Sequence, residues 1–337
     1  MTEKQYGGST GRGKENSIKT SMQNSPTSNP KQKKKEILQK DNSSKMTKEE
    51  KIIEAGKIAK KVTEYARTII KKDMKLLEIA EKIEEKIIEL GGKPAFPTNL
   101  SMNDIAAHYT PSYNDETLAK GLLKVDLGVH VNGYVADTAF SIDLENSEEN
   151  KKLIEASEKA LKNALEIANE DISISEIGKA VQETIESFGF SPIINLSGHE
   201  MQQYDLHAGL TIPNNDNKST LEVSKGTYAI EPFATNGSGK VYEGKPSGIY
   251  ALINWKNVRS ETAREIAEFI ETEYQTLPFC SRWLVKQFGT KALFGLKQLE
   301  ENENIHQYPQ LIESSHGKVS QAEHTILISK EKIITTI

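Results

Sequence analysis

A single predicted β-hairpin, centred on Asn132-Gly133, constrains this chain more than any other segment. A two-residue type I′ turn needs positive φ at both central positions, and Asn-Gly meets that need best. With the turn placed there, residue 128 opposes 137 and residue 126 opposes 139. This register decides which side chains share each face of the hairpin.

The two faces of this hairpin differ in their chemistry. Side chains alternate along a strand, so one face collects the apolar residues Val125, Leu127, Val129, Val131, Tyr134, Ala136 and Phe140. Asp126 and Asp137 lie together on the other face as diagonal cross-strand neighbours, with Cα atoms roughly 7–8 Å apart. Carboxylates that close repel each other unless a positive charge lies between them. The hairpin therefore predicts a metal site.

Composition indicates a globular protein that works in a reducing compartment. The chain has 337 residues, 36% of them apolar and 27% charged, which allows one large domain or two with a sizeable core. Its single cysteine, Cys280, excludes an internal disulfide and has no acid–base partner nearby in the sequence, so we expect a packed thiol. The sequence contains neither a membrane-spanning apolar run nor an N-terminal apolar segment, which favours the cytoplasm without membrane contact.

Charge is distributed unevenly, and residues 1–45 differ from the rest of the chain. Of 43 basic and 48 acidic residues, this segment holds ten and four, whereas the remainder holds 33 and 44. An acidic body does not suit nucleic-acid binding, so no specific nucleic-acid partner is expected. Residues 1–45 are poor in apolar side chains and are expected to form a disordered basic tail. The basic cluster at 31–35 could contact a ribosome, although a solvated tail is the favoured interpretation.

The first good helical pattern begins directly after Met46. Thr47 and Glu50 have the spacing of a capping box, which is typical of a helix N-terminus. Residues 1–45 can therefore also be explained as an artefact of start-site assignment, with Met46 as the biological start.

The rest of the chain contains clusters of predicted helices and strands. Hydrophobic periodicity predicts helices within 47–90 and at about 148–169, 174–188 and 259–273. Extended segments are predicted at 123–143, 192–196, 208–212, 227–234 and 248–254, with a final β pair from 323–329 and 333–337. The clusters do not follow a strict βαβ alternation, so an α+β fold is favoured.

Further candidate metal ligands and acid–base groups follow the hairpin. His199 and His207 lie in a glycine-flanked stretch, and Glu231 and Glu323 lie in predicted strands of otherwise apolar and small residues. A carboxylate at such a position is unfavourable unless it is paired or binds a metal. Each residue alone has an ordinary structural explanation. Together with the two hairpin aspartates, they favour a metal centre.

Six segments, taken in order, form a recognisable pattern. They are Phe96-Pro-Thr, Ala106-Ala-His-Tyr-Thr-Pro, 125–128 with 137–140, 198–209, 229–233 and 323–327. Over residues 47–337 the chain closely resembles the type II methionine aminopeptidases, the archaeal and eukaryotic form. The resemblance implies a pita-bread fold, in which pseudo-twofold halves surround a curved antiparallel sheet. It implies a catalytic domain at 46–337 that includes a helical insert at about 255–320.

The resemblance also implies a centre of two divalent metal ions. Its ligands would be Asp126, Asp137, His199, Glu231 and Glu323, with Asp137 and Glu323 shared by both ions. Glu231 would also move the proton of the water that the ions activate. Carboxylates and one imidazole suit ions such as Co²⁺, Mn²⁺, Fe²⁺ or Zn²⁺.

The activity that the resemblance implies is removal of the initiator methionine from nascent polypeptides whose second residue is small. His108 and His207 would flank the scissile peptide as catalytic, substrate-binding residues, and Phe96 would form a wall of the methionine pocket. We expect a monomer whose partners are nascent polypeptide N-termini. The chain departs from the eukaryotic pattern at Leu210, where those members have lysine.

Three polar residues near these segments are expected to lie outside the metal centre. His130 lies close to the hairpin turn. His324 adjoins Glu323 on a strand and therefore points to the opposite face. Asp205 lies between the two histidines of its stretch and is expected to face solvent.

Two other classes with the same fold provide alternative interpretations. Prolidases and aminopeptidases P usually carry a separate N-terminal domain, which residues 1–45 cannot form. Non-catalytic, proliferation-associated relatives keep the fold but have lost metal ligands. All five ligand positions and both histidines are present here, so the aminopeptidase interpretation is favoured.

Overall fold

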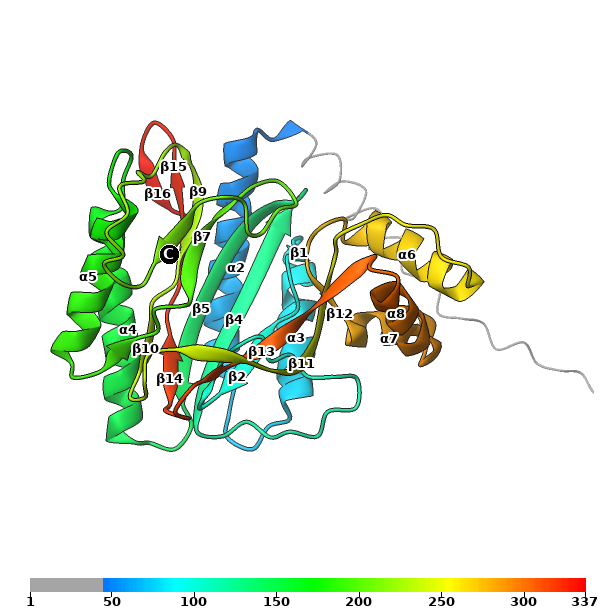
Figure 1. The fold of residues 1–337 in the computed structure, drawn as a ribbon, viewed down its shortest axis with the longest axis horizontal. Helices are drawn as coiled ribbons and strands as arrows, with labels where there is room; N and C mark the ends of the chain where they lie inside the picture. The colour runs from blue at the N-terminus through cyan, green and yellow to red at the C-terminus, as the bar shows by residue number, and fades with distance from the viewer. Residues whose placement is uncertain (1–44) are drawn as a thin grey trace, which may run out of the picture. The chain divides into compact units, whose positions relative to one another are not determined.

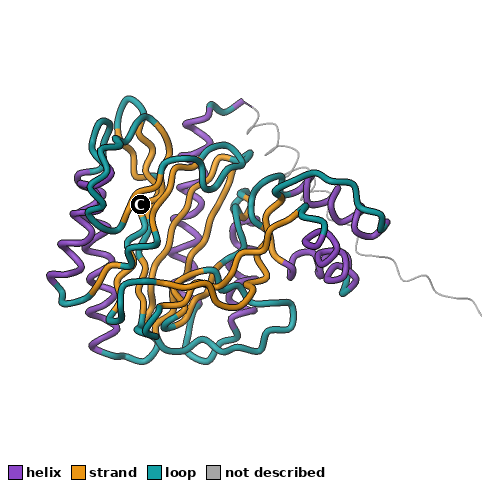
Figure 2. Tube along the Cα trace, in the orientation of Figure 1, coloured by secondary structure: helices purple, strands orange, loops and turns teal. Residues whose placement is uncertain are grey.

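The computed structural model describes residues 45–337, so the predicted tail at 1–45 lies almost entirely outside the described residues. The described residues belong to one compact unit. Figure 2 shows its strands gathered in the middle, with helices on either side and behind them. This mixture of helices with antiparallel sheets confirms the α+β prediction.

The first half of the fold consists of two helices and a four-stranded sheet. Its elements are α2 (Lys48–Ile69), α3 (Leu76–Glu89), β1 (Lys93–Pro94), β2 (Asn99–Met102), β4 (Leu122–Val131) and β5 (Tyr134–Asp143). β4 pairs with each of the three other strands. The predicted capping box starts α2, since Thr47 and Glu50 exchange side-chain-to-backbone hydrogen bonds of 2.7 and 3.2 Å.

The hairpin of β4 and β5 has the register that the sequence predicts. Asn132 and Gly133 have φ values of 50° and 81°, as a type I′ turn requires. Gly128 opposes Asp137, and Asp126 opposes Ala139. The apolar face packs against α2 and α3, where its side chains are buried apart from that of Tyr134. This packing orients the aspartate face away from the two helices.

The second half repeats this arrangement with another helix pair and a five-stranded sheet. Its elements are α4 (Glu148–Ile167), α5 (Ile174–Ser187), β7 (Ser197–Met201), β8 (Thr211–Pro213), β9 (Gly226–Ile230), β15 (His324–Ile328) and β16 (Lys332–Ile334). The strands are ordered β16-β15-β9-β7-β8, and the predicted C-terminal β pair is confirmed. A smaller sheet of β6 (Ser191–Pro192), β10 (Phe233–Thr235) and β14 (Val319–Gln321) lies beside α4 and α5.

The strand predicted at 192–196 is wrong beyond its first residue. β6 ends at Pro192, and the chain then turns. The Asn195 side chain takes over the pairing, because its amide donates to the Val241 carbonyl at 2.8 Å and accepts from the Val241 N–H at 2.9 Å. A side chain that bonds to the backbone N–H and carbonyl of a neighbouring strand takes the place of strand-to-strand hydrogen bonds. The apolar pair Ile193-Ile194 favoured a strand in the sequence and gave no indication of this side-chain contact.

The two halves meet where β5 contacts β15. Ala139 and Glu323 form an antiparallel bridge with N–H to carbonyl distances of 2.9 and 3.3 Å. Two residues further along each strand, the Thr325 hydroxyl donates to the Asp137 carbonyl at 2.8 Å and accepts from the Asp137 N–H at 2.7 Å. This contact places the aspartates of the hairpin beside Glu323.

The remaining helices form a layer with its own core. They are α6 (Glu261–Glu273), α7 (Ser281–Phe288) and α8 (Lys291–Glu301), and α7 follows the short strand β12 (Phe279–Cys280). β12 lies at the edge of a sheet with β11 (Val241–Leu252), β13 (Ile305–Glu313) and β3 (Ile105–Ala107). Figure 1 shows α6–α8 on the side of the strands opposite α4 and α5. Within residues 45–337, no helix is both long and apolar enough to cross a membrane.

The contact between the halves can be tested with Thr325→Val. Thr325 is fully buried, so valine would leave the N–H and carbonyl of Asp137 without partners. We expect a loss of about 1–3 kcal/mol in the free energy of unfolding, measured by denaturant titration. Thr272→Val, on the exposed side of α6, is the matched control and should change this free energy by less than about 0.5 kcal/mol. Equal stabilities for the two variants would contradict the importance of the contact.

Candidate metal centre

Four carboxylates and one imidazole from separate strands converge on one cavity. Asp126 and Asp137 come from the hairpin, and His199 comes from β7. Glu231 directly follows β9 and Glu323 directly precedes β15. Because β9 and β15 pair with each other, the two residues lie at the same end of this strand pair. The cavity has a volume of about 250 Å³, and all five predicted ligand residues line it. Strand alternation brings the side chains of Asp126, Asp137 and His199 to this face.

The polar atoms of these residues lie close together, and some of them lack protein partners. His199 Nε2 lies 3.8 Å from Asp137 Oδ2 and 3.7 Å from Glu231 Oε1. One ligand atom each from Asp137, His199 and Glu323 fall within 4.8 Å of one another. Asp126 Oδ1 and Asp137 Oδ1 are buried and receive no hydrogen bond from any described residue. A cation in this space would satisfy them.

Burial controls the protonation of the cluster. It raises the pKa of Asp126 to about 7. Burial, followed by repulsion from neighbouring carboxylates, raises the pKa values of Asp137, Glu231 and Glu323 well above their usual range. The pKa of His199 falls to about 3, mainly through burial, so its imidazole is neutral and keeps a lone pair for a ligand. This donor set fits divalent metal ions of intermediate hardness.

The two histidines predicted beside the scissile bond also line the cavity. His108 has a φ of 63°, an uncommon conformation for a residue other than glycine, and its Nδ1 lies 3.1 Å from the Pro309 carbonyl. A carbonyl only accepts, so Nδ1 carries the proton and Nε2 keeps its lone pair. Burial lowers the pKa of His108 to about 4. The His207 ring lies 4.5 Å from that of His199, and its side chain is exposed at the cavity rim.

Next to the polar groups, the cavity has an apolar wall. Phe96, which was expected to form a wall of the methionine pocket, contributes to it, and its ring lies against Gly128 of β4, where a Cβ would come within 2.3 Å of the ring. Ile249, Pro278 and Tyr308 also line the wall. None of these three was predicted as a site residue, and Ile249 and Tyr308 lie in strands that carry no motif of their own.

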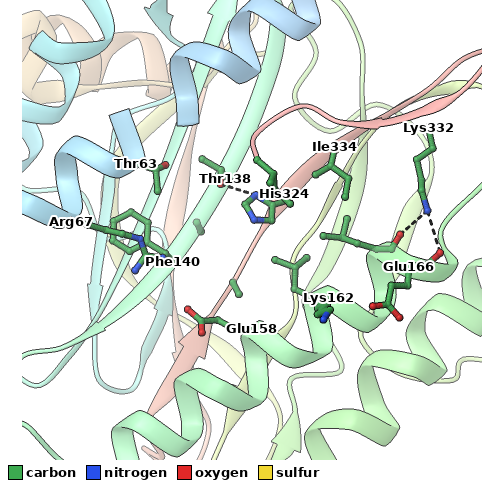
Figure 3. Close-up of a pocket in the computed structure, with 15 residues that line it drawn as sticks. Thr63, Arg67, Thr138, Phe140, Glu158, Lys162, Glu166, His324, Lys332 and Ile334 are labelled. Atoms are coloured by element: carbon green, nitrogen blue, oxygen red, sulfur yellow. Dashed lines mark hydrogen bonds between the residues drawn. The ribbon is translucent and has the colours of Figure 1, made fainter. Parts of the chain in front are cut away.

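The residues expected to lie outside the centre do so. His324 lines a different cavity of about 550 Å³ on the other face of the sheet, between α2 and α4, as strand alternation predicts. Figure 3 shows it there beside Thr138, with Arg67 and Glu158 across the cavity. The His130 ring accepts a hydrogen bond from the Gly133 N–H at 3.0 Å. Asp205 is exposed.

Cys280 is fully buried, and burial raises the pKa of its thiol to about 12. At neutral pH it therefore stays protonated, which supports the prediction of a packed thiol rather than a nucleophile.

Comparison with known proteins gives a consistent result. Residues 50–270 match metallopeptidase family M24. A methionine aminopeptidase of Pyrococcus abyssi is 47% identical over 294 residues, which cover 85% of this chain and 98% of that protein. A methionine aminopeptidase of Methanocaldococcus jannaschii is 47% identical over 291 residues, with the same coverage.

Solved structures with lower identity share the fold. A thermophilic Arx1 superposes with a TM-score of 0.74 at 17% identity, covering 85% of this chain and 89% of that one. A methionine aminopeptidase of Thermotoga maritima gives 0.61 at 22% identity, covering 85% and 95%. A prolidase of Pyrococcus furiosus gives 0.54 at 19% identity, covering 89% of this chain and 67% of that one. These likenesses confirm the predicted pita-bread fold.

The raised pKa values predict that metal binding releases protons. In the metal-free fold Asp126 holds its proton up to about pH 7, and raised pKa values keep Asp137, Glu231 and Glu323 protonated well above the usual range of a carboxyl. In the unfolded chain these groups lose their protons near pH 4. Their contribution to stability is therefore present below about pH 4 and is lost as pH rises through the folded values. We expect Mn²⁺ to raise the melting temperature more at pH 8 than at pH 6. Calorimetry in buffers of different ionisation enthalpy should detect proton release, and its absence would contradict the assignment.

Proposed function

The chain belongs to the methionine aminopeptidases of metallopeptidase family M24, and we propose that it removes the initiator methionine from nascent polypeptides whose second residue is small. One observation carries the proposal: the metal-ligand candidates and two non-ligand histidines line a single cavity that continues into an apolar wall. A hydrolytic centre and a side-chain pocket thus adjoin each other.

We assign two divalent ions, from among Co²⁺, Mn²⁺, Fe²⁺ and Zn²⁺, to five residues of the cavity. Asp126, Asp137, His199, Glu231 and Glu323 would hold them, with Asp137 and Glu323 shared. When bound, two such ions lower the pKa of a water and stabilise negative charge on the attacked carbonyl. The unpartnered aspartate oxygens and the mutual repulsion of the carboxylates support this assignment.

Glu231 and the two histidines supply the proton chemistry and the orientation. Once metal binding has released its proton, the Glu231 carboxylate can take a proton from water and pass it to the leaving amine. His108 presents an unprotonated Nε2, which can accept a hydrogen bond from the N–H of the scissile peptide. His207 lines the same cavity and would donate to the substrate carbonyl.

The cavity restricts the substrate by size and polarity. Its volume of about 250 Å³ is below the roughly 300–1,000 Å³ of sites that enclose drug-sized ligands, so it suits one side chain. An unbranched, polarisable methionine side chain fits an irregular apolar wall such as that formed by Phe96, Ile249 and Tyr308.

The setting of the reaction is part of the same proposal. The partners are nascent polypeptide N-termini, which a monomer would process in the cytoplasm. Contact with the ribosome through the basic cluster at 31–35 stays a prediction, since that segment lies outside the described residues.

Peptide hydrolysis tests the proposed function directly. Protein loaded with Mn²⁺ should release methionine from Met-Ala-Ser and should not cleave Ala-Pro, the type of bond that a prolidase prefers. Removal of the metal with a chelator should abolish release, and added Mn²⁺ should restore it. Equal rates with and without metal would contradict the metal-dependent mechanism, and preferential cleavage of Ala-Pro would contradict the substrate class.

Two substitutions test the assigned roles. Glu231→Gln and His108→Ala should each lower kcat for Met-Ala-Ser by about 10²–10⁴-fold, because each removes a group that acts on a proton or a peptide hydrogen bond. Circular dichroism and melting temperature should show an intact fold. Asp205→Asn, an exposed substitution close to His207, is the control and should keep kcat within about twofold of the wild type. Wild-type turnover in Glu231→Gln would overturn the role of that carboxyl.

A further inference from the structure

A buried ion pair lies outside the lining of the cavity that holds the metal-ligand candidates. Glu84 of α3 and Arg282 of α7 have exposed fractions of 6% and 3%. They form a bidentate pair, with Arg282 Nη1 donating to Glu84 Oε2 at 2.6 Å and Nη2 donating to Oε1 at 2.8 Å. The pair links the first half of the fold to the helical layer of α6–α8.

Two further donors and two acceptors complete the Glu84–Arg282 pair, one of the acceptors being the Thr110 hydroxyl oxygen, 3.4 Å from Arg282 Nη2. The Trp283 Nε1–H donates to Glu84 Oε2 at 2.8 Å, and the Thr98 N–H donates to Oε1 at 3.2 Å. Arg282 Nε donates to the Pro111 carbonyl at 3.0 Å. A charge pair with this many hydrogen bonds in a buried position holds the joined segments in one geometry.

The joined segments are the ones that carry the wall of the cavity. Thr98 is two residues from Phe96, and Thr110, whose hydroxyl donates to the Thr98 carbonyl at 2.9 Å, is two residues from His108. Arg282 is four residues from Pro278. Phe96, His108 and Pro278 all line the cavity, although neither Glu84 nor Arg282 does.

The geometry points to Glu84 and Arg282 as positioning residues that set the shape of the methionine pocket and hence its selectivity. They would act through the chain segments that present Phe96, His108 and Pro278, without touching the substrate or the metal ions. This inference rests on the proposed function, because it names residues that tune the same site.

Physical chemistry favours a role in geometry over a role in stability. Two charges lose their hydration on burial, and replacing such a pair with neutral residues of similar size is often neutral or stabilising. The planar guanidinium fork, in contrast, fixes direction as well as distance. A wall displaced by a fraction of an ångström would still allow folding and metal binding, but it would fit methionine less well.

The test separates stability from selectivity with two variants. In Glu84→Gln the guanidinium stays buried without its charge partner, so we expect a large loss of melting temperature. The double variant Glu84→Gln with Arg282→Met removes both charges and keeps an amide oxygen that can accept from Trp283 or from Thr98. We expect it to recover most of that loss. Its KM for Met-Ala-Ser should still rise about tenfold, and its preference for Met-Ala-Ser over Leu-Ala-Ser should fall by a similar factor.

A second ion pair between the same two parts of the fold provides the matched control. Lys93 of β1 and Glu273 of α6 lie 2.5 Å apart, with side chains about half exposed. Lys93→Met with Glu273→Gln makes the same chemical changes at the surface. It should leave KM and selectivity unchanged, since exposed pairs contribute little.

Three measurements decide the outcome. Wild-type KM and selectivity in the folded double variant would overturn the inference. The Mn²⁺ affinity of the double variant, measured by calorimetry, should match that of the wild type. If the double variant does not fold, Arg282→Lys keeps the charge but loses the fork, and unchanged selectivity there would overturn the inference equally. Failure of the wild-type protein to release methionine would instead contradict the proposed function alone.

Discussion

Repulsion among four carboxylates, two buried and two half-buried, is the constraint on which this structure depends. Asp126, Asp137, Glu231 and Glu323 face one cavity, and burial together with their mutual repulsion favours their protonated forms. Such a cluster is unfavourable unless the surrounding fold holds it firmly and a cation compensates its charge. The helices that bury the apolar backs of the strands provide the firm support.

The cluster also explains why the two halves of the fold must meet where they do. Each half alone contributes only part of the set, from the hairpin on one side and from β7, β9 and β15 on the other. The Ala139–Glu323 bridge and the paired hydrogen bonds of Thr325 join the halves across the site. A one-residue slip at this contact would turn Glu323 to the face where His324 now lies.

Local rules predicted some features because they depend only on neighbouring residues. The Asn132-Gly133 turn set the hairpin register, and strand alternation then placed Asp126 and Asp137 on one face. The same alternation separated His324 from Glu323. The strand predicted at 192–196 was wrong because the Asn195 side chain, and not a strand backbone, makes the hydrogen bonds to Val241, which is distant in the sequence. Hydrophobic periodicity does not indicate such a side-chain-to-backbone contact.

By itself, the sequence determined the hairpin, the helix start at Thr47 and the candidate chemical groups, because turn chemistry, capping and side-chain alternation are local. Resemblance to a known family added the expected set of metal ligands to these predictions. Only the tertiary structure decided that these groups share one cavity, that Ile249, Pro278 and Tyr308 complete its wall, and that the Glu84–Arg282 pair lies outside its lining. These contacts join segments up to about 200 residues apart, as the 198-residue separation of Glu84 and Arg282 illustrates. Their geometry follows from how the packed layers meet, which no local pattern encodes.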